Sequence, residues 1–339
     1  MLQAKLGIII IIDMVHQRAR GAAAARSGRR RLAAAAAGAA VAGVALLASG
    51  CSSSLAAIAV GGSGGKIIAV GAENEYADVI GQVGGKYVQV SAVMSNPNTD
   101  PHTFEASASV GRLVNAARLV VQNGLGYDTF MDTIENAVPD SSRRVIVVQK
   151  LLGLPDSTPN PHLWYQPGTM PAAAKAMAAD LSALQPAHKS YFQANLAAFD
   201  KSLAPWLNAI AQFKATYPGT PVATTEPVAD YMLQAAGTDN LTPFSFQADI
   251  MNGVDPTPQD VSLENSFFTQ HKVKVFCYNQ QVVDSLTTSI RQTALKAGVP
   301  VVGVYETMPT PGYDYQSWML AEVQALQKAV AGKISTQKL

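Results

Sequence analysis

Short apolar runs rich in Val and Ile alternate along the chain with longer stretches whose apolar residues recur at helical spacing. In the first half these runs lie at residues 67 to 70, 87 to 93, 118 to 122 and 144 to 148, and in the second half at 221 to 225, 273 to 279 and 299 to 305. Near-continuous apolar strands separated by helices indicate parallel sheets covered on both faces. The pattern therefore predicts an α/β fold with two Rossmann-like lobes.

The segment between the two sets of runs has no strand signal. Its apolar residues recur at helical spacing from Met170 to Leu184, and Pro186 then opens a longer helix that Tyr217 and the following Pro-Gly end. Pro205 is expected to kink that helix. A stiff connector helix is predicted, with a surface helical hairpin as the alternative. The resulting organisation is an N-terminal lobe at 66–185, a connector helix at 186–217 and a C-terminal lobe at 218–339.

The first fifty residues differ from the rest of the chain in charge. They hold seven Lys or Arg and one acid, a net charge of +6, whereas the whole chain has +1 and the remaining 289 residues therefore carry −5. A basic N-terminal segment before a mildly acidic remainder of the chain is typical of an export signal followed by a secreted domain. Because the chain as a whole has no basic excess, we expect no nucleic-acid partner.

The basic N-terminal segment also has the layout of a lipoprotein signal. Three arginines at 29 to 31 precede an uninterrupted apolar run at 32 to 48, and the sequence Leu-Ala-Ser-Gly-Cys that ends at Cys51 resembles a lipobox. We expect a signal peptide at 1–50, a Gly- and Ser-rich tether at 51–65 and a lipidated Cys51 that anchors the protein outside the cytoplasm. A transmembrane helix or an ordinary cleaved signal is the alternative. The start site, Met1 or Met14, and the export route, general or twin-arginine, stay open.

Four polar side chains lie after predicted strands, at the sheet edge where open α/β proteins bind ligands. His102 and His162, each directly behind a proline, follow strands of the first lobe, whereas Glu226 and Glu306 directly follow strands of the second. Imidazole nitrogens and carboxylate oxygens are ligands of Zn²⁺, Mn²⁺ and Fe²⁺, and four protein ligands leave no open position for catalysis. Each residue alone also fits a structural role, but the four together favour a metal carried as cargo.

The other residues with metal-binding chemistry have simpler interpretations. His188 in the connector helix and His271 beside Lys272 are expected to be solvated or capping residues. Cys277 lies inside a predicted strand and, with Cys51 lipidated, has no disulfide partner, so a buried, unreactive thiol is expected.

The chain resembles the substrate-binding lipoproteins of ABC transporters that import zinc or manganese. Residues 100–105, Asp-Pro-His-Thr-Phe-Glu, are similar to the family's Asp-Pro-His-x-Phe-Glu-Pro, with Ala106 at the position of the last proline. Residues 117–126 are similar to a strand and turn of the family that contribute no ligand, with Arg118 at a position where Asp is usual. The resemblance extends from about Lys66 to the C-terminus.

The resemblance also implies a set of ligands. Residues 160–167, Asn-Pro-His-Leu-Trp-Tyr-Gln-Pro, are similar to the second ligand motif, with Gln166 in place of an Asp, so a carboxylate that orients His162 is missing or comes from elsewhere. Residues 225–231 look like the third ligand segment, with Glu226 as the ligand. Glu306 is the candidate for the fourth, and Asp314 is its rival.

The function implied is that of an extracytoplasmic solute-binding lipoprotein, not an enzyme, which captures a divalent metal ion between its lobes and delivers it to an ABC permease. We expect it to be a monomer. Two imidazoles and two carboxylates are harder donors than a His-rich set and suit Mn²⁺, whereas the Irving-Williams order favours Zn²⁺, so the choice of metal stays open. A stiff connector predicts small lobe movements. The alternatives are a secreted metal-dependent hydrolase, with Glu226 or Glu306 as general base, and a metal-binding surface adhesin.

Overall fold

The computed structural model describes residues 65–98, 102 and 104–339. Both sheets belong to one compact unit of the chain, Ile58–Leu339. The predicted signal peptide, the lipobox and all of the tether except its last residue lie outside the described residues. No helix in the described part of the chain is long and apolar enough to cross a bilayer.

The N-terminal lobe is built on a parallel four-stranded sheet in the order β2-β1-β3-β4. Its strands are β1 Ile67–Glu73, β2 Val88–Met94, β3 Leu119–Gln122 and β4 Arg144–Val147, and its helices are α1 Asn74–Gly84, α2 Ala108–Ala116, α3 Thr129–Ala137, α4 Val148–Leu151 and α5 Thr169–Leu184, with short 3₁₀ turns η1 Gly85–Tyr87, η3 Leu163–Tyr165 and η4 Pro186–His188. Alternate strand residues point to opposite faces, so Ala69 packs with α1 and α5 and Val70 with α2 and α3.

The C-terminal lobe repeats this plan with a parallel sheet in the order β6-β5-β7-β8. Its strands are β5 Pro221–Thr224, β6 Asp239–Asn240, β7 Val275–Asn279 and β8 Val301–Val304, and its helices are α8 Asp230–Ala235, α9 Phe244–Met251, α10 Pro258–Thr269, α11 Ser285–Lys296 and α12 Tyr315–Gly332. The two α/β lobes confirm the predicted fold class. The apolar pattern missed only β6, since two residues are too short for a periodicity.

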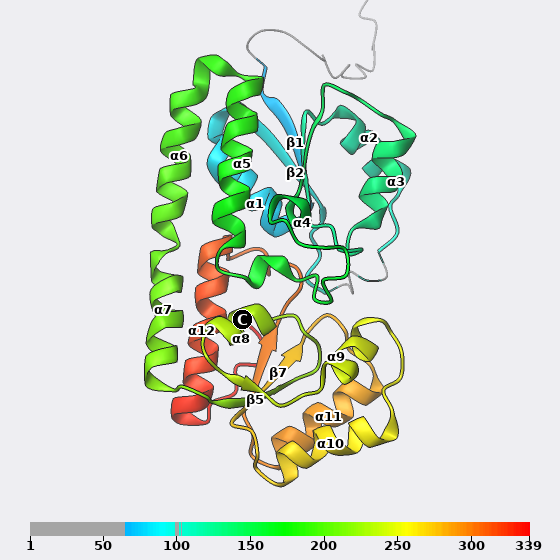
Figure 1. Cartoon of the computed structure of the whole chain (residues 1–339), viewed down its shortest axis with the longest axis vertical. Coiled ribbons are helices and arrows are strands. Elements are labelled where there is room, and N and C mark those ends of the chain that lie inside the picture. Colours follow the sequence, from blue (N-terminus) through cyan, green and yellow to red (C-terminus); the bar gives the residue numbers. More distant parts are fainter. Residues whose placement is uncertain (1–64, 99–101, 103) are drawn as a thin grey trace, which may run out of the picture. The chain divides into compact units, whose positions relative to one another are not determined.

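The connector is two helices, not one: α6 Lys189–Ser202 and α7 Ala204–Thr216. The break falls at Leu203, and Pro205 lies in the first turn of α7, where its missing N–H costs no helical hydrogen bond. Figure 1 shows α6 and α7 following one another along both lobes, with α12 beside α7. The predicted kink is therefore a one-residue interruption at Leu203, two residues before the proline.

The seam between the lobes is closed by side chains as well as by the connector. One hydrophobic cluster runs from Ile67 in the first sheet to Val302 in the second. The Tyr165 hydroxyl donates to the Tyr305 carbonyl at 2.9 Å and lies 3.2 Å from the Glu322 carboxyl, while the Tyr315 hydroxyl donates to the Trp164 carbonyl at 2.6 Å. The 3₁₀ turn directly after His162 is thus fixed to the C-terminal lobe.

Candidate metal centre

Three predicted ligands converge on a single carboxylate oxygen. Glu306 Oε2 lies 3.0 Å from His102 Nε2 and 3.2 Å from His162 Nε2. Together these three residues offer ligand atoms that all lie within 4.8 Å of one another. Glu226 approaches this group through its Oε2, which lies 4.0 Å from His102 Nε2. The structure therefore brings His102, His162 and Glu306 together, while Glu226 lies beside His102 and outside that group of three.

The orientation of the His162 ring is set by Asn160. The Asn160 amide donates to the Pro227 carbonyl at 2.7 Å, which directs its Oδ1 toward the backbone N–H of His162 at 3.0 Å and toward Nδ1 of the ring at 2.8 Å. Because Oδ1 only accepts, Nδ1 carries the ring proton and Nε2 presents its lone pair. Asn160 thus supplies the orienting group that Gln166 leaves out, as an amide and not as a carboxylate.

The two carboxylates are held by amides of the C-terminal lobe. Asn279, the last residue of β7, donates to Glu226 Oε1 at 3.0 Å and to Glu306 Oε1 at 2.6 Å. The side-chain oxygen Oε1 of Gln281 accepts from the backbone N–H groups of Glu306 and Thr307 at 2.6 and 2.8 Å. One oxygen of Glu306 is thus used to fix the side chain, while Oε2 points toward the imidazoles.

Burial and neighbouring charges have opposing effects on the pKa of Glu306 and on that of His162. Burial raises the pKa of the Glu306 carboxyl, but the charge of His102 and the close contacts with both imidazoles outweigh it and bring the pKa below the ordinary value. Burial lowers the pKa of the His162 imidazole, and its contact with Glu306 only partly opposes the shift. Glu306 is therefore ionised at neutral pH and His162 is neutral.

The geometry suits a cation between these groups. His162 Nε2 has its lone pair toward Glu306 Oε2, and Tyr127 already donates to the same oxygen at 3.0 Å. A neutral imidazole nitrogen and a carboxylate oxygen at this distance repel each other unless they share a proton or a metal ion. Neutral imidazole and carboxylate are also the donor set of divalent transition metals.

The family of the chain follows from comparison with known proteins. A family model described as zinc-uptake complex component A, periplasmic, matches residues 70–329. This chain belongs to that family. The zinc-uptake component A proteins are the metal-binding solute-binding proteins of ABC import systems, so a divalent metal ion is cargo and no hydrolase chemistry is part of the family's work.

Solved structures of other proteins share the fold of this chain. TroA, a periplasmic zinc-binding protein from Treponema pallidum, is 19% identical with a TM-score of 0.67, covering 80% of this chain and 100% of that chain. FpvC from Pseudomonas aeruginosa, in complex with Mn²⁺, is 18% identical with a TM-score of 0.64 over 79% of this chain and 99% of that chain. A search of curated protein sequences gives no match.

The other residues singled out in the sequence have structural positions. Asp314 caps α12, its side chain accepting from the backbone N–H of Ser317 at 2.9 Å. His188 stacks on the ring of Tyr87 at 3.6 Å, so it is more than a solvated residue, while His271 is an exposed turn residue with φ of 53°. Cys277 is buried and free, as expected, and burial raises the pKa of its thiol. Cys51 lies outside the described residues.

Sequence reasoning gave no supporting role to Asn160, Asn279, Gln281 or Tyr127, which all contact the predicted ligands. Asn279 ends a predicted strand, so the rule that placed Glu226 and Glu306 could have found it. Tyr127 lies in the turn after β3 and had no signal, because only folding brings its hydroxyl to Glu306.

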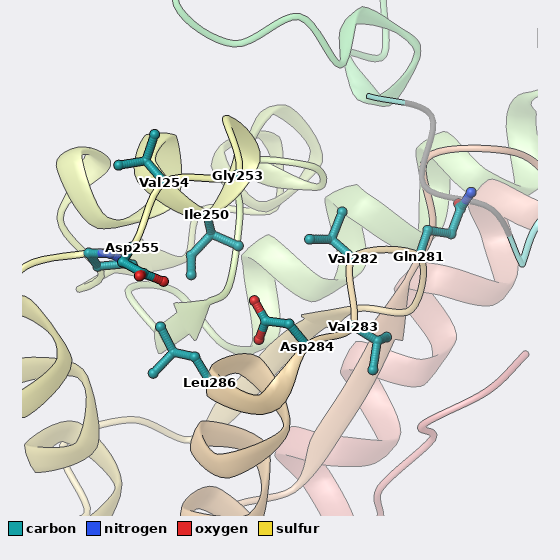
Figure 2. Close-up of a pocket in the computed structure, with 10 residues that line it drawn as sticks. Ile250, Gly253, Val254, Asp255, Gln281, Val282, Val283, Asp284 and Leu286 are labelled. Atoms are coloured by element: carbon teal, nitrogen blue, oxygen red, sulfur yellow. The ribbon is translucent and has the colours of Figure 1, made fainter. Parts of the chain in front are cut away.

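A hollow of about 250 Å³ adjoins the site on the C-terminal lobe, between the loop after α9 and the loop after β7 (Figure 2). Val254 and Val283 on its rim are 55% and 56% exposed. Gln281 lies at one end, and its side chain points away from Asp284 and Leu286 (Figure 2). The same loop therefore lines the hollow and holds the backbone of Glu306.

Proposed function

We propose that this protein captures one divalent transition-metal ion, zinc or manganese, with His102, His162, Glu226 and Glu306 and delivers it to an ABC permease. The observation that carries the proposal is the convergence of two imidazole nitrogens on Glu306 Oε2, with the lone pair of His162 facing a carboxylate. Four protein ligands close the coordination shell, which favours carriage over catalysis.

Both lobes contribute ligands to the proposed metal site. Each lobe supplies two ligands, so an ion bound by all four links the lobes directly. The hydrogen bonds of Tyr165 and Tyr315 across the seam resist wide opening. Small movements of the loops that carry the ligands are therefore expected to admit and release the ion.

Calorimetric titration of the chelated protein tests the proposal, with Zn²⁺ and Mn²⁺ titrated separately. One saturable site per chain is expected, together with a higher melting temperature, because a ligand present at a thousandfold excess over Kd stabilises the folded state by about 4 kcal/mol. His188→Ala and His271→Ala are matched controls that keep both effects. If the wild type binds neither ion saturably, the protein is not a metal carrier of this kind.

The donor set leaves both metals possible. Two carboxylates favour Mn²⁺ more than a His-rich set would, but the same ligands should hold Zn²⁺ more tightly by the Irving-Williams order. Competition between the two ions in the same titration gives their ratio of affinities. A ratio near one would indicate that geometry offsets the intrinsic preference for zinc.

The protein is further proposed to be a monomer anchored outside the cytoplasm by lipid on Cys51. The support is the lipobox-like sequence before Cys51 and the periplasmic family of the chain. Cys51→Ser is expected to release the protein from the membrane fraction, because stable attachment needs the acyl chains of a lipoprotein. Unchanged membrane association would exclude the lipid anchor without affecting the metal site.

A further inference from the structure

The amino-terminal edge of the first sheet carries a basic residue before every strand. Lys66 directly precedes β1, Lys86 lies two residues before β2, Arg118 directly precedes β3 and Arg143 directly precedes β4. We name the exposed basic surface at this end the basic edge, and define it as Lys66, Lys86, Arg118, Arg144 and Lys189. Arg143 is only 8% exposed and is not part of it. The basic edge lies at the opposite end of the strands from the metal ligands, so the proposed capture of metal does not explain it.

Contacts join these residues into one surface. Arg118, Arg143 and Arg144 line a single cavity of about 670 Å³ together with Leu184 at the end of α5. Next to Leu184, the Gln185 amide donates to the Gly65 carbonyl at 2.8 Å, which places the turn between α5 and α6 beside the first described residue. Figure 1 shows that turn and the start of β1 at the same end of the lobe.

The other half of the surface combines a cation with aromatic rings. The Lys86 ammonium lies 5.1 Å from the ring centre of Tyr87 and 5.6 Å from that of Tyr191. Tyr87 stacks on His188, which directly precedes Lys189. Tyrosine rings beside basic side chains are typical of surfaces that meet a bilayer at the level of its headgroups.

The charge of the basic edge contrasts with that of the rest of the protein. Its acidic neighbours are Asp180, which pairs with Arg144 at 3.3 Å, Asp140 near Arg118 and Arg143, and Glu135 facing Arg143. Five exposed basic residues against three acids leave an excess of positive charge, whereas residues 51 to 339 together carry −5. A local positive excess on an acidic body is complementary to an anionic surface.

We propose that the basic edge binds the anionic phosphate headgroups of the membrane to which the protein is anchored. The choice of a membrane rests on the proposed lipid on Cys51, which precedes Gly65 by fourteen residues, a span of at most about 50 Å when fully extended. The chain thus enters the lobe at this edge and within reach of the bilayer. Because the metal ligands follow the opposite ends of the strands, binding here leaves the capture site open to ions.

Sedimentation with lipid vesicles tests the proposal on residues 58–339, a compact unit that contains both sheets and their cores. This unit is expected to bind vesicles of equimolar phosphatidylglycerol and phosphatidylcholine at low salt and to dissociate from them at high salt. It should not bind vesicles of pure phosphatidylcholine. Combining Lys66→Gln, Lys86→Gln and Arg118→Gln should lower binding about a hundredfold, at about fivefold per charge.

The matched control is the triple variant Lys272→Gln, Lys274→Gln and Lys296→Gln, which removes three exposed charges from the other lobe. It should lower vesicle binding less than about fivefold. Equal losses in the two variants, or no binding by the wild type, would overturn the proposal. So would saturable binding of inorganic phosphate without vesicle binding, since the edge would then serve a soluble oxyanion. None of these measurements needs a metal or an acyl chain, so they are independent of the proposed capture and anchoring.

Discussion

The two lobes have the same strand order but supply the metal site in different ways. Glu226 and Glu306 lie two residues beyond the last residues of β5 and β8, where the strands fix their position. His102 and His162 lie on long loops, eight residues after β2 and fifteen after β4. The C-terminal lobe therefore presents a preformed pair of carboxylates, while the N-terminal lobe needs further contacts to place its imidazoles.

The two histidines of the N-terminal lobe differ in burial and in the contacts that hold them. His162 is completely buried and is fixed through Asn160, which in turn bonds to the C-terminal lobe. His102 keeps 22% of its side-chain surface exposed. A ligand at the end of a strand is positioned by the strand itself. The position of a ligand outside a strand or helix depends on the contacts that its side chain makes. His102 is accordingly the ligand expected to move when the ion enters.

The largest effect is expected from Glu306→Ala, because both imidazoles and Tyr127 point at this carboxylate. Metal affinity should fall by more than about a hundredfold, the upper limit for a residue that only orients a ligand. Asp314→Ala is the matched control on the same lobe. It should leave affinity unchanged and lower the free energy of unfolding by about 1 kcal/mol through loss of a helix cap. The reverse result in calorimetric titration would make Asp314 the fourth ligand.

Paired variants of the two histidines test their difference in rigidity. His162→Ala and His102→Ala should both weaken metal binding, but only His162→Ala should destabilise the chelated protein, by about 2 kcal/mol, because it leaves a cavity and unpaired polar groups. For His102→Ala the free energy of unfolding should change by less than about 0.5 kcal/mol. Thermal unfolding in chelator measures both. Equal destabilisation would show that the His102 side chain stabilises the folded protein as much as that of His162.

Asn160→Ala addresses the orientation of the buried imidazole. Loss of the acceptor at Nδ1 frees the ring to change its tautomer, so affinity should fall about 10- to 100-fold, as for other residues that orient a metal ligand. Asn160→Asp keeps the acceptor and should recover most of the affinity. If the Asp variant is as weak as the Ala variant, Asn160 acts through its bond to Pro227 and not through the ring.

The smallest effect is expected from mild acidification. Metal binding needs neutral imidazoles, and protons compete as the pH falls. Burial lowers the pKa of His162 below the ordinary 6.5, so protonation of this ligand begins to weaken binding only below that pH, while Glu306, whose pKa is also lowered, stays ionised. Titration against a fluorescent chelator at several pH values should show less than a tenfold loss of affinity due to His162 between pH 8 and about pH 6. A larger loss that disappears in His162→Ala would contradict the burial argument.

Much of the fold could be read from the chain. Seven of the eight strands, the helical segment between the lobes and an irregularity near Pro205 follow from apolar periodicity and from the chemistry of proline, although one kinked helix was predicted and two helices are present. The four proposed ligands could be named because two follow Pro in a repeated motif and two follow strands directly. That the two lobes share one strand order could not be read, because the sequence of the two sheets shows no repeat and strand order depends on pairing between distant segments.

The sequence by itself determined which residue types lie at the ends of the strands, since alternation and turn chemistry are local properties of the chain. Only the tertiary structure decided which atoms meet. Asn160 became the group that orients His162 because Pro227, 67 residues away, fixes its amide, and Asn279 joins Glu226 to Glu306 across 53 and 27 residues of chain. Hydrogen bonds fix atoms within a few tenths of an ångström, and packing between distant segments sets that precision where local sequence cannot.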